Sequence, residues 1–214
     1  MSKMIEQTTL AMYSDKKSNK LLPIHGEKRL SFSQMIKKVE ERPWKTGEFQ
    51  MQNWGNWLHH MSAYVGKLKP GMAHWLIRVS TIPGDTILDP FSGIGTVPLE
   101  ADFMGRKGIG IDLNPYVAAI SRAKFDRKSM SERIEYLKNL KLDTESIKTR
   151  DISPFIKQYF HEKTLKEIFA LKKILIDEKQ DFLLGCLIGI LHGHRPGHLS
   201  ATTSLVIPFI PKTK

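Results

Sequence analysis

The chain has 214 residues, and 41% of them are hydrophobic, which is enough to bury the core of one domain. Its 33 Lys and Arg residues outnumber 22 Asp and Glu residues, giving a formal net charge of +11, and domains this basic usually bind polyanions. No apolar stretch is long enough to cross a bilayer and none resembles a signal peptide, so we expect a cytoplasmic protein without membrane contact.

Residues 1–53 are interpreted as an N-terminal extension. Residues 14–20 (SDKKSNK) predict a solvated loop, and residues 30–40 predict a helix with Ser31 or Ser33 as its N-cap. Three tryptophans then follow within residues 42–57: Trp44, Trp54 and Trp57. Such a group could stack on nucleic-acid bases, although packing against the domain that follows is the favoured interpretation.

Residues 86–115 (TILDPFSGIGTVPLEADFMGRKGIGIDLNP) predict one β-α-β unit. The apolar run 86–90 ends at an acidic residue and a proline, as a buried strand ends at the edge of a parallel sheet. A glycine-rich turn, an apolar-periodic helix around residues 99–104 and a second strand over 108–112 follow. This order is typical of a nucleotide-binding unit.

The residue types in this unit indicate the chemistry of its ligand. Gly93 and Gly95 let the backbone approach a ligand where a Cβ would collide or forbid a positive φ. Asp112, at the tip of the second strand, can accept two hydrogen bonds from a ribose diol. A third glycine, needed to admit a pyrophosphate, is missing, and Asp89 at the loop entrance would repel phosphate but hold an ammonium group. We therefore expect a cationic nucleoside rather than a dinucleotide.

These motifs resemble those with which amino-methylating DNA methyltransferases, of the cytosine-N4 and adenine-N6 types, bind S-adenosyl-L-methionine. Residues 64–70 (YVGKLKP) are similar to the family's Tyr-x-x-Lys-Phe-x-Pro element, from which Leu68 departs. In the resemblance, Asp112 matches the residue that binds the ribose hydroxyls. The cofactor-binding residues that the resemblance implies are Tyr64, Lys67, Pro70, Asp89, Pro90, Phe91, Gly93, Gly95, Thr96, Asp112, Asn114 and Pro115.

The resemblance implies an α/β fold, the Rossmann-like fold of class I methyltransferases, here incomplete and with helix-rich additions. The family sheet has about seven strands, whereas this sequence predicts two and a third over 204–210. We assign residues 54–214 to a partial S-adenosylmethionine-binding domain with a helical insertion at about 129–193. Helices are predicted at residues 116–127, 131–149, 162–178 and 181–192.

The family's catalytic signature, Asp/Asn/Ser-Pro-Pro-Tyr/Phe, does not occur in this sequence. In that signature polar groups accept hydrogen bonds from the exocyclic amine, and the aromatic ring stacks on the flipped base. The nearest segment, residues 207–211 (IPFIP), has an apolar Ile where an acceptor is required, so we interpret it as an ordered loop. No catalytic residue is assigned, and we expect a DNA methyltransferase that needs a second polypeptide carrying the signature.

Two other functions stay open. One is an RNA methyltransferase of the guanine-N2 type, whose cofactor loops also read Asp-Pro-x-x-Gly-x-Gly-Thr. The other is a non-catalytic product of a truncated or split gene, which binds cofactor or DNA without chemistry. Methylation at cytosine C5 is disfavoured, because Cys186, the single cysteine, lacks the Pro-Cys context of that reaction.

Neither the cysteine nor the histidines predict a metal site. Cys186 lies in the apolar run 181–192, has no zinc-ligand spacing around it, and is interpreted as a small core residue in a reduced, intracellular protein. His192, His194 and His198 have no nearby cysteine or carboxylate to complete a site. We expect a helix that ends at His192, with Gly193 as its C-cap, and a loop that borders the active site or DNA.

Overall fold

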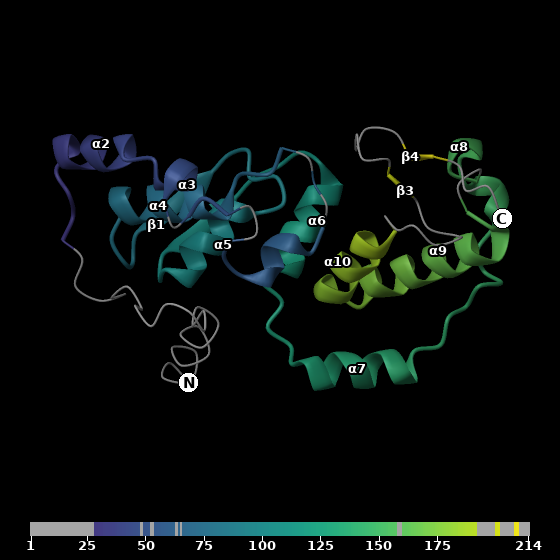
Figure 1. Cartoon of the computed structure of the whole chain (residues 1–214). Helices are drawn as coiled ribbons and strands as arrows, with labels where there is room; N and C mark the ends of the chain where they lie inside the picture. The colour runs from purple at the N-terminus through teal and green to yellow at the C-terminus, as the bar shows by residue number, and fades with distance from the viewer. Residues whose placement is uncertain are drawn as a thin grey trace. The chain divides into compact units, whose positions relative to one another are not determined.

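The computed structural model describes residues 28–47, 49–51, 54–62, 64, 66–157, 160–191, 200–201 and 208–209. The chain divides into two compact units (Figure 1). Unit 1 consists of Met1–His60 and Gly66–Ser121, and unit 2 of Met61–Val65 and Arg122–Lys214. The division predicted from the sequence, into an extension of 53 residues and one domain, stays a prediction.

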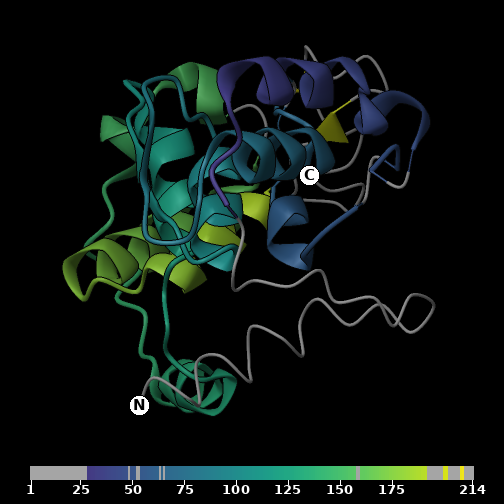
Figure 2. The same ribbon diagram turned by 90° about the vertical axis from the view of Figure 1, so that its left-hand side faces the viewer.

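Unit 1 contains the predicted β-α-β segment together with helices that precede it. Its elements are α2 (Phe32–Glu40), α3 (Pro43–Thr46), η1 (Trp57–His60), α4 (Pro70–Ser80), β1 (Thr86–Asp89), α5 (Thr96–Phe103), β2 (Lys107–Gly110) and α6 (Pro115–Ala123), the last ending inside unit 2. Helix α2 runs beside α4 (Figure 2). The sequence did not predict α3 or η1, whereas the start of α4 at Pro70 agrees with the loop and helix start that the Tyr-x-x-Lys-Phe-x-Pro resemblance implies.

Helix α2 confirms the first predicted helix and its cap. The Ser31 hydroxyl accepts a hydrogen bond from the Gln34 N–H, and the Gln34 side chain accepts one from the Ser31 N–H. Two N–H groups that the helix itself cannot bond are thereby satisfied. Of the two serines considered, Ser31 is therefore the N-cap.

The two strands pair in parallel, with Thr86 opposite Lys107 and Asp89 opposite Gly110. Helix α5 covers one face of this pair, and its approach depends on glycine: a Cβ on Gly108 would lie 2.6 Å from the Cα of Pro98 in α5. A buried cluster of Ile77, Ala101 and Met104 packs with Ile87 and Val97 between α4, α5 and β1. Unit 1 is thus a mixed helical unit built around a small parallel sheet, which agrees with part of a methyltransferase fold.

Arg106 joins the two connections that lead into β1 and β2. Its guanidinium donates hydrogen bonds to the Met104 carbonyl at 2.6 Å and to the Thr81 carbonyl at 2.9 Å, and its Nε donates to the Thr81 hydroxyl at 3.2 Å. The residue is 5% exposed. A planar group with several fixed donors can serve these acceptors at once, which a lysine ammonium cannot do in the same geometry.

We expect Arg106→Ala to lower the free energy of unfolding by roughly 1–3 kcal/mol, because buried carbonyl groups lose their donors. Arg106→Lys should recover only part of that loss. Arg150→Ala is the matched control, since its side chain is 77% exposed and its loss should change stability by less than about 0.5 kcal/mol. Urea unfolding followed by circular dichroism measures all three. Equal urea-unfolding midpoints for Arg106→Ala and Arg150→Ala would contradict the proposed stabilising role of the Arg106 hydrogen bonds.

Unit 2 is helical over most of its described length. Its elements are α7 (Met130–Asn139), η2 (Thr149–Asp151), α8 (Pro154–Lys157), α9 (Glu162–Asp177), α10 (Asp181–Ile190), β3 (Ser200–Ala201) and β4 (Pro208–Phe209). Helices α9 and α10 lie side by side (Figure 1). A second buried cluster of Ile152, Phe160 and Leu165 lies near the start of α9. The predicted helices over 162–178 and 181–192 are confirmed by α9 and α10 except at the end of the second: α10 ends at Ile190 with Leu191 as its C-cap, not at His192 with Gly193.

The prediction of one helix over residues 131–149 is wrong beyond residue 139. The backbone turns extended at Leu140, with φ −69° and ψ 128°. Farther on, the Asp143 carboxylate accepts a hydrogen bond from the Ser146 N–H, and the Ser146 hydroxyl donates to the Asp143 carbonyl. Short polar side chains that bond the local backbone in this way compete with helix formation.

The remaining predictions for the C-terminal part are only partly covered by the described residues. Of the strand predicted over 204–210, the structure describes Pro208–Phe209, which pairs antiparallel with Ser200–Ala201. The loop of His192, His194 and His198 lies outside the described residues, as does the 14–20 segment. Cys186 is a half-buried free thiol, and burial raises its pKa. No helix among the described residues has both the length and the apolar content needed to cross a bilayer.

Two of the three tryptophans pack as predicted. Trp44 is buried, and the ring of Trp54 meets the rings of Phe49 and His74 edge-on, with centroids 4.9 and 4.8 Å away. Trp57 is 53% exposed. Packing within unit 1 therefore accounts for Trp44 and Trp54, whereas Trp57 stays more than half exposed.

Candidate functional site

The loop between β1 and α5 (residues 90–95, the glycine loop) is held to the end of β2 by backbone hydrogen bonds. The Ser92 N–H donates to the Ile111 carbonyl at 3.0 Å, and the Ile111 N–H donates to the Asp89 carbonyl at 2.9 Å. One Asp89 carboxylate oxygen accepts a hydrogen bond from the Phe91 N–H at 3.1 Å. The ends of both strands and the glycine loop therefore meet at one edge of the sheet, where parallel α/β sheets bind ligands.

Two glycines in this loop have the backbone conformation that the sequence predicted. Gly93 has φ 50° and Gly95 has φ 76°, both in the left-handed region that disfavours other residues. A Cβ on Gly95 would also collide with the side chain of Ser121. Gly95 is the N-cap of α5, and Thr96, the first residue of that helix, is buried.

Asp112 connects the tip of the second strand to the glycine loop. Its Oδ2 accepts a hydrogen bond from the Gly93 N–H at 2.9 Å, and its Oδ1 accepts one from the Asn114 N–H at 2.9 Å. Each carboxylate oxygen has a second lone pair, so the group can still accept hydrogen bonds from a ligand. This bond to Gly93 was not foreseen from the sequence, which assigned Asp112 to ligand binding alone.

The residues that flank Asp112 shape the start of α6. The Asn114 side-chain oxygen accepts a hydrogen bond from the Tyr116 N–H at 3.0 Å, next to Pro115, the first residue of that helix. Leu113 is fully exposed, and Phe91 in the glycine loop is 88% exposed. An apolar side chain from each loop is thus free to contact a ligand.

The contacts described for Lys67 and Pro70 do not involve the glycine loop. Lys67 donates from Nζ to the His59 carbonyl at 2.9 Å, and burial lowers its pKa. Pro70 is buried as the first residue of α4. Tyr64 is half-buried and belongs to unit 2. For Lys67 and Pro70 the structure shows structural roles, and their contact with a cofactor stays a prediction.

A fully buried carboxylate, missed by the sequence reasoning, lies one turn into α5. Glu100 is 0% exposed, with Oε1 2.6 Å from His59 Nε2 and Oε2 2.9 Å from His74 Nδ1. His59 comes from η1 and His74 from α4, so one side chain ties both segments to the helix that begins at the glycine loop. Gly55 lies against the same cluster, since a Cβ there would be 3.7 Å from Glu100 Oε1.

The two imidazoles compensate for the burial of this carboxylate. Burial alone would raise the pKa of Glu100, but the hydrogen bonds and charge of His59 and His74 outweigh it and lower the pKa below its ordinary value. Glu100 is therefore an ionised acceptor for two ring N–H groups. The available sequence signal was a glutamate between Leu99 and Ala101, on the apolar side of a predicted helix, where charge is unexpected.

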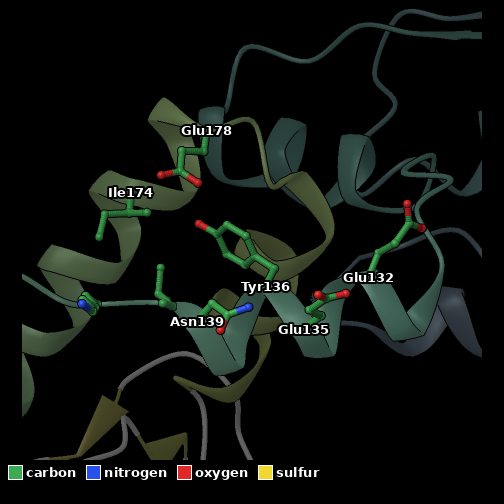
Figure 3. Close-up of a pocket in the computed structure, with 8 residues that line it drawn as sticks. Glu132, Glu135, Tyr136, Asn139, Ile174 and Glu178 are labelled. Atoms are coloured by element: carbon green, nitrogen blue, oxygen red, sulfur yellow. The ribbon is translucent and has the colours of Figure 1, made fainter.

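Unit 2 contains an open pocket of about 490 Å³ between α7 and α9 (Figure 3). Its lining residues are Glu132, Glu135, Tyr136, Asn139, Leu140, Lys141, Ile174 and Glu178. The Tyr136 hydroxyl points toward Glu178 (Figure 3), and burial together with that carboxylate raises the pKa of Tyr136 to about 12. None of the predicted cofactor-binding residues lines this pocket. No group of three metal-ligating side chains occurs among the described residues.

Comparison with known proteins associates the region around the glycine loop with one family. The sequence model of the N6/N4 DNA methylase family matches residues 5–123. The Type II methyltransferase M.MjaII of Methanocaldococcus jannaschii is 32% identical over 134 residues, covering 56% of this chain and 24% of the relative. Type II methyltransferase M.BsoBI of Geobacillus stearothermophilus is 35% identical over 114 residues, covering 52% of this chain and 20% of the relative.

A shorter similarity extends to an RNA-modifying protein. The tRNA (guanine(10)-N2)-dimethyltransferase of Methanothermobacter thermautotrophicus is 38% identical over 52 residues, which is 24% of this chain and 16% of the relative. The chain thus spans less than a quarter of the length of each of these relatives. No solved structure matches the chain.

Proposed function

The chain belongs to the DNA methylase family, and on this premise we propose that its glycine loop binds S-adenosyl-L-methionine as part of an enzyme that methylates DNA. The observation that carries the proposal is the 2.9 Å hydrogen bond from the Gly93 N–H to Asp112, which brings the strand-tip carboxylate and the glycine loop together. The proposed cofactor-binding residues are Tyr64, Lys67, Pro70, Asp89, Pro90, Phe91, Gly93, Gly95, Thr96, Asp112, Asn114 and Pro115.

The geometry around the loop fits such a ligand. Gly93 is partly exposed at the sheet edge, whereas Gly95 is buried against Ser121, and a Cβ on Gly110 would meet the Ser92 hydroxyl at 2.7 Å. Asp112 keeps lone pairs for the ribose hydroxyls, while Asp89 can attract the ammonium group of the methionine end. The bound cofactor would supply a sulfonium methyl group, and this chain's residues would hold and orient it.

The target that we propose is the exocyclic amine of cytosine N4 or adenine N6 in DNA. Such an amine is a weak nucleophile, so the enzyme must hold its lone pair in line with the methyl group and accept its hydrogen bonds. This sequence has no Pro-Pro-aromatic signature for that task. We propose that a second polypeptide supplies the signature, and that the net charge of +11 assists contact with the DNA backbone.

A second candidate is an RNA methyltransferase of the guanine-N2 type. The similarity to a protein named as a tRNA guanine-N2 dimethyltransferase supports it, but over 52 residues rather than 134. Methylation assays on DNA and on tRNA with the completed enzyme separate the two candidates. A non-catalytic role, binding cofactor or DNA only, is the outcome if neither substrate accepts methyl groups.

We expect Asp112→Ala to weaken S-adenosylmethionine binding by about 1–3 kcal/mol, because a charged acceptor for the ribose is removed and the Gly93 N–H loses its partner. Isothermal titration calorimetry on the purified chain measures this. The matched control is Asp143→Ala, because that carboxylate also accepts a backbone N–H, from Ser146, but lies in unit 2. Wild-type affinity in the Asp112 variant would remove this residue from the site, and no binding by the wild type would contradict the proposed function.

A further inference from the structure

The buried Glu100 carboxylate holds both ends of residues 61–69, the segment that connects η1 to α4. Glu100 lies one turn into α5, the helix that begins at Gly95 of the glycine loop. Its Oε1 is 2.6 Å from Nε2 of His59, which belongs to η1. Its Oε2 is 2.9 Å from Nδ1 of His74, which belongs to α4. One side chain therefore fixes the elements before and after this segment to the helix of the glycine loop.

Lys67 is attached to the same cluster through the backbone of His59. The Lys67 Nζ donates a hydrogen bond to the His59 carbonyl at 2.9 Å. His59 thus accepts from the ammonium on its main chain and contacts Glu100 with its ring. An ammonium has three N–H donors, so the group can still donate to a ligand. The place of the Lys67 ammonium therefore depends on the place of His59.

The tie between η1 and α5 depends on Glu100. His59 is 1% exposed, and its other ring nitrogen, Nδ1, is buried without a hydrogen-bond partner among the described residues. Its bond to the carboxylate is therefore what holds the ring in place by hydrogen bonding. The packing is close as well: a Cβ on Gly55 would lie 3.4 Å from His59 Cδ2, 3.5 Å from Pro70 Cβ and 3.7 Å from Glu100 Oε1.

A metal ion does not explain this cluster. The two imidazole nitrogens lie 2.6 and 2.9 Å from the carboxylate oxygens, which are hydrogen-bond distances. Within the part of the chain that the structure describes, no three side chains are arranged to hold a metal. A buried carboxylate is costly to desolvate, and one established use of such a group is to specify a single geometry.

We propose that Glu100 and His59 are positioning residues of the cofactor site, which hold the Lys67 ammonium in a fixed place relative to the glycine loop. The proposal rests on the proposed function, because Lys67 is one of the residues proposed to bind S-adenosyl-L-methionine. The contacts form a continuous series: Glu100 in α5 holds the His59 ring, and the His59 carbonyl holds Lys67. Residues behind a binding site act in this way when they keep the contact residues in the productive geometry.

Isothermal titration calorimetry with S-adenosyl-L-methionine on the full chain tests the positioning role. We expect Glu100→Gln to weaken binding about tenfold, an effect within the range that loss of a supporting partner causes at other binding sites. Arg106→Ala is the matched control, because it should destabilise unit 1 to a similar extent but its hydrogen bonds lie at the connections into β1 and β2. Its affinity should equal that of the wild type. Thermal unfolding checks that each variant is folded at the assay temperature.

Two further comparisons separate positioning from stability. In a Lys67→Met background, Glu100→Gln should weaken binding no further, because the two residues act on the ligand through one series of contacts. His59→Leu should weaken binding as Glu100→Gln does. His59→Gln should recover most of the affinity, because its amide N–H can donate to the carboxylate in place of the ring.

NMR of the lysine side-chain nitrogens reports on Lys67 without the cofactor. Burial lowers the pKa of Lys67 from 10.5 in the wild-type chain. Release of the ammonium to solvent in Glu100→Gln should raise that pKa toward 10.5. Loss of a nearby negative charge alone would lower the pKa instead, so the direction of the change identifies its cause. The spectrum of Lys67→Met assigns the signal.

Unchanged affinity in Glu100→Gln, or equal losses in Glu100→Gln and Arg106→Ala, would overturn the proposal. A further loss from Glu100→Gln in the Lys67→Met background would overturn it as well, and so would a pKa of Lys67 that does not rise in Glu100→Gln. Failure of the wild-type chain to bind S-adenosyl-L-methionine would refute the proposed function. The NMR titration would then still decide whether Glu100 positions Lys67.

Discussion

Replacing Glu100 with alanine is expected to lower the free energy of unfolding by on the order of 3–5 kcal/mol, the usual effect of removing one partner from a buried, charge-assisted group. The carboxylate is 0% exposed and accepts hydrogen bonds from His59 and His74 at 2.6 and 2.9 Å. Its loss leaves two buried ring N–H groups without an acceptor and a cavity between η1, α4 and α5. Urea unfolding at neutral pH measures the change.

Two further variants separate the charge from the side-chain volume. Glu100→Gln fills nearly the same space but can accept from one imidazole while presenting an N–H group to the other, so it should cost about 1–3 kcal/mol. Glu135→Ala, an exposed glutamate on α7, is the matched control and should change stability by less than about 0.5 kcal/mol. A Glu100→Ala protein as stable as the Glu135 variant would mean that the cluster contributes nothing to the fold.

The same cluster predicts a dependence of stability on pH. The pKa of Glu100 is lowered in the folded chain relative to its ordinary value of 4.5, so near that value the unfolded chain binds more protons than the folded chain. The contribution of Glu100 to the free energy of unfolding is therefore complete above about pH 4.5, and it is lost as the pH falls through the lower pKa that Glu100 has in the folded chain. Asp85 and Asp126 also have lowered pKa values, so the test is the difference between wild type and Glu100→Gln. If the unfolding free energies of wild type and Glu100→Gln changed in parallel with pH, Glu100 would not be a source of the pH dependence.

The second large effect concerns catalysis: we expect the isolated chain to transfer no methyl group to DNA. Nothing in the sequence between Pro115 and Lys214 combines a hydrogen-bond acceptor, a proline pair and an aromatic residue. Without oriented acceptors and a stacking ring around the flipped base, the exocyclic amine is not activated. A tritiated-methyl assay on plasmid DNA should give background counts for the chain alone. Adding a polypeptide that carries the Pro-Pro-aromatic signature should restore incorporation.

The controls of this assay distinguish a missing partner from a missed catalytic element. Full-length M.MjaII is the positive control for substrate and label, and tRNA in place of plasmid tests the RNA alternative. Incorporation by the chain alone that Asp89→Ala abolishes would show that the chain has its own catalytic element. The stretch from Ser200 to Phe209 would then be the first place to search for it.

Local sequence determined the parts of this protein whose structure depends on near neighbours. Ser31 caps α2 as its side chain predicts, and the order of apolar runs, glycines and acidic tips specified β1, α5 and β2. Gly93 and Gly95 adopt positive φ values because few other residues can do so at low cost. The model of the DNA methylase family matches residues 5–123, a range that includes this segment.

Tertiary structure decided what depends on residues distant in the chain. Glu100 contacts residues 41 and 26 positions earlier, and Arg106 contacts Thr81. Hydrophobic periodicity does not predict these contacts, because burying a charge is favourable only when its partners come from other elements. The end of α7 at Asn139 was likewise set by the extended backbone at Leu140 and the Asp143–Ser146 turn beyond it, against a charge pattern that favoured a longer helix. Asp112 shows both effects. The sequence predicts its position at the tip of the second strand, whereas its hydrogen bond from Gly93 forms only because parallel pairing brings the loops after β1 and β2 to one edge of the sheet.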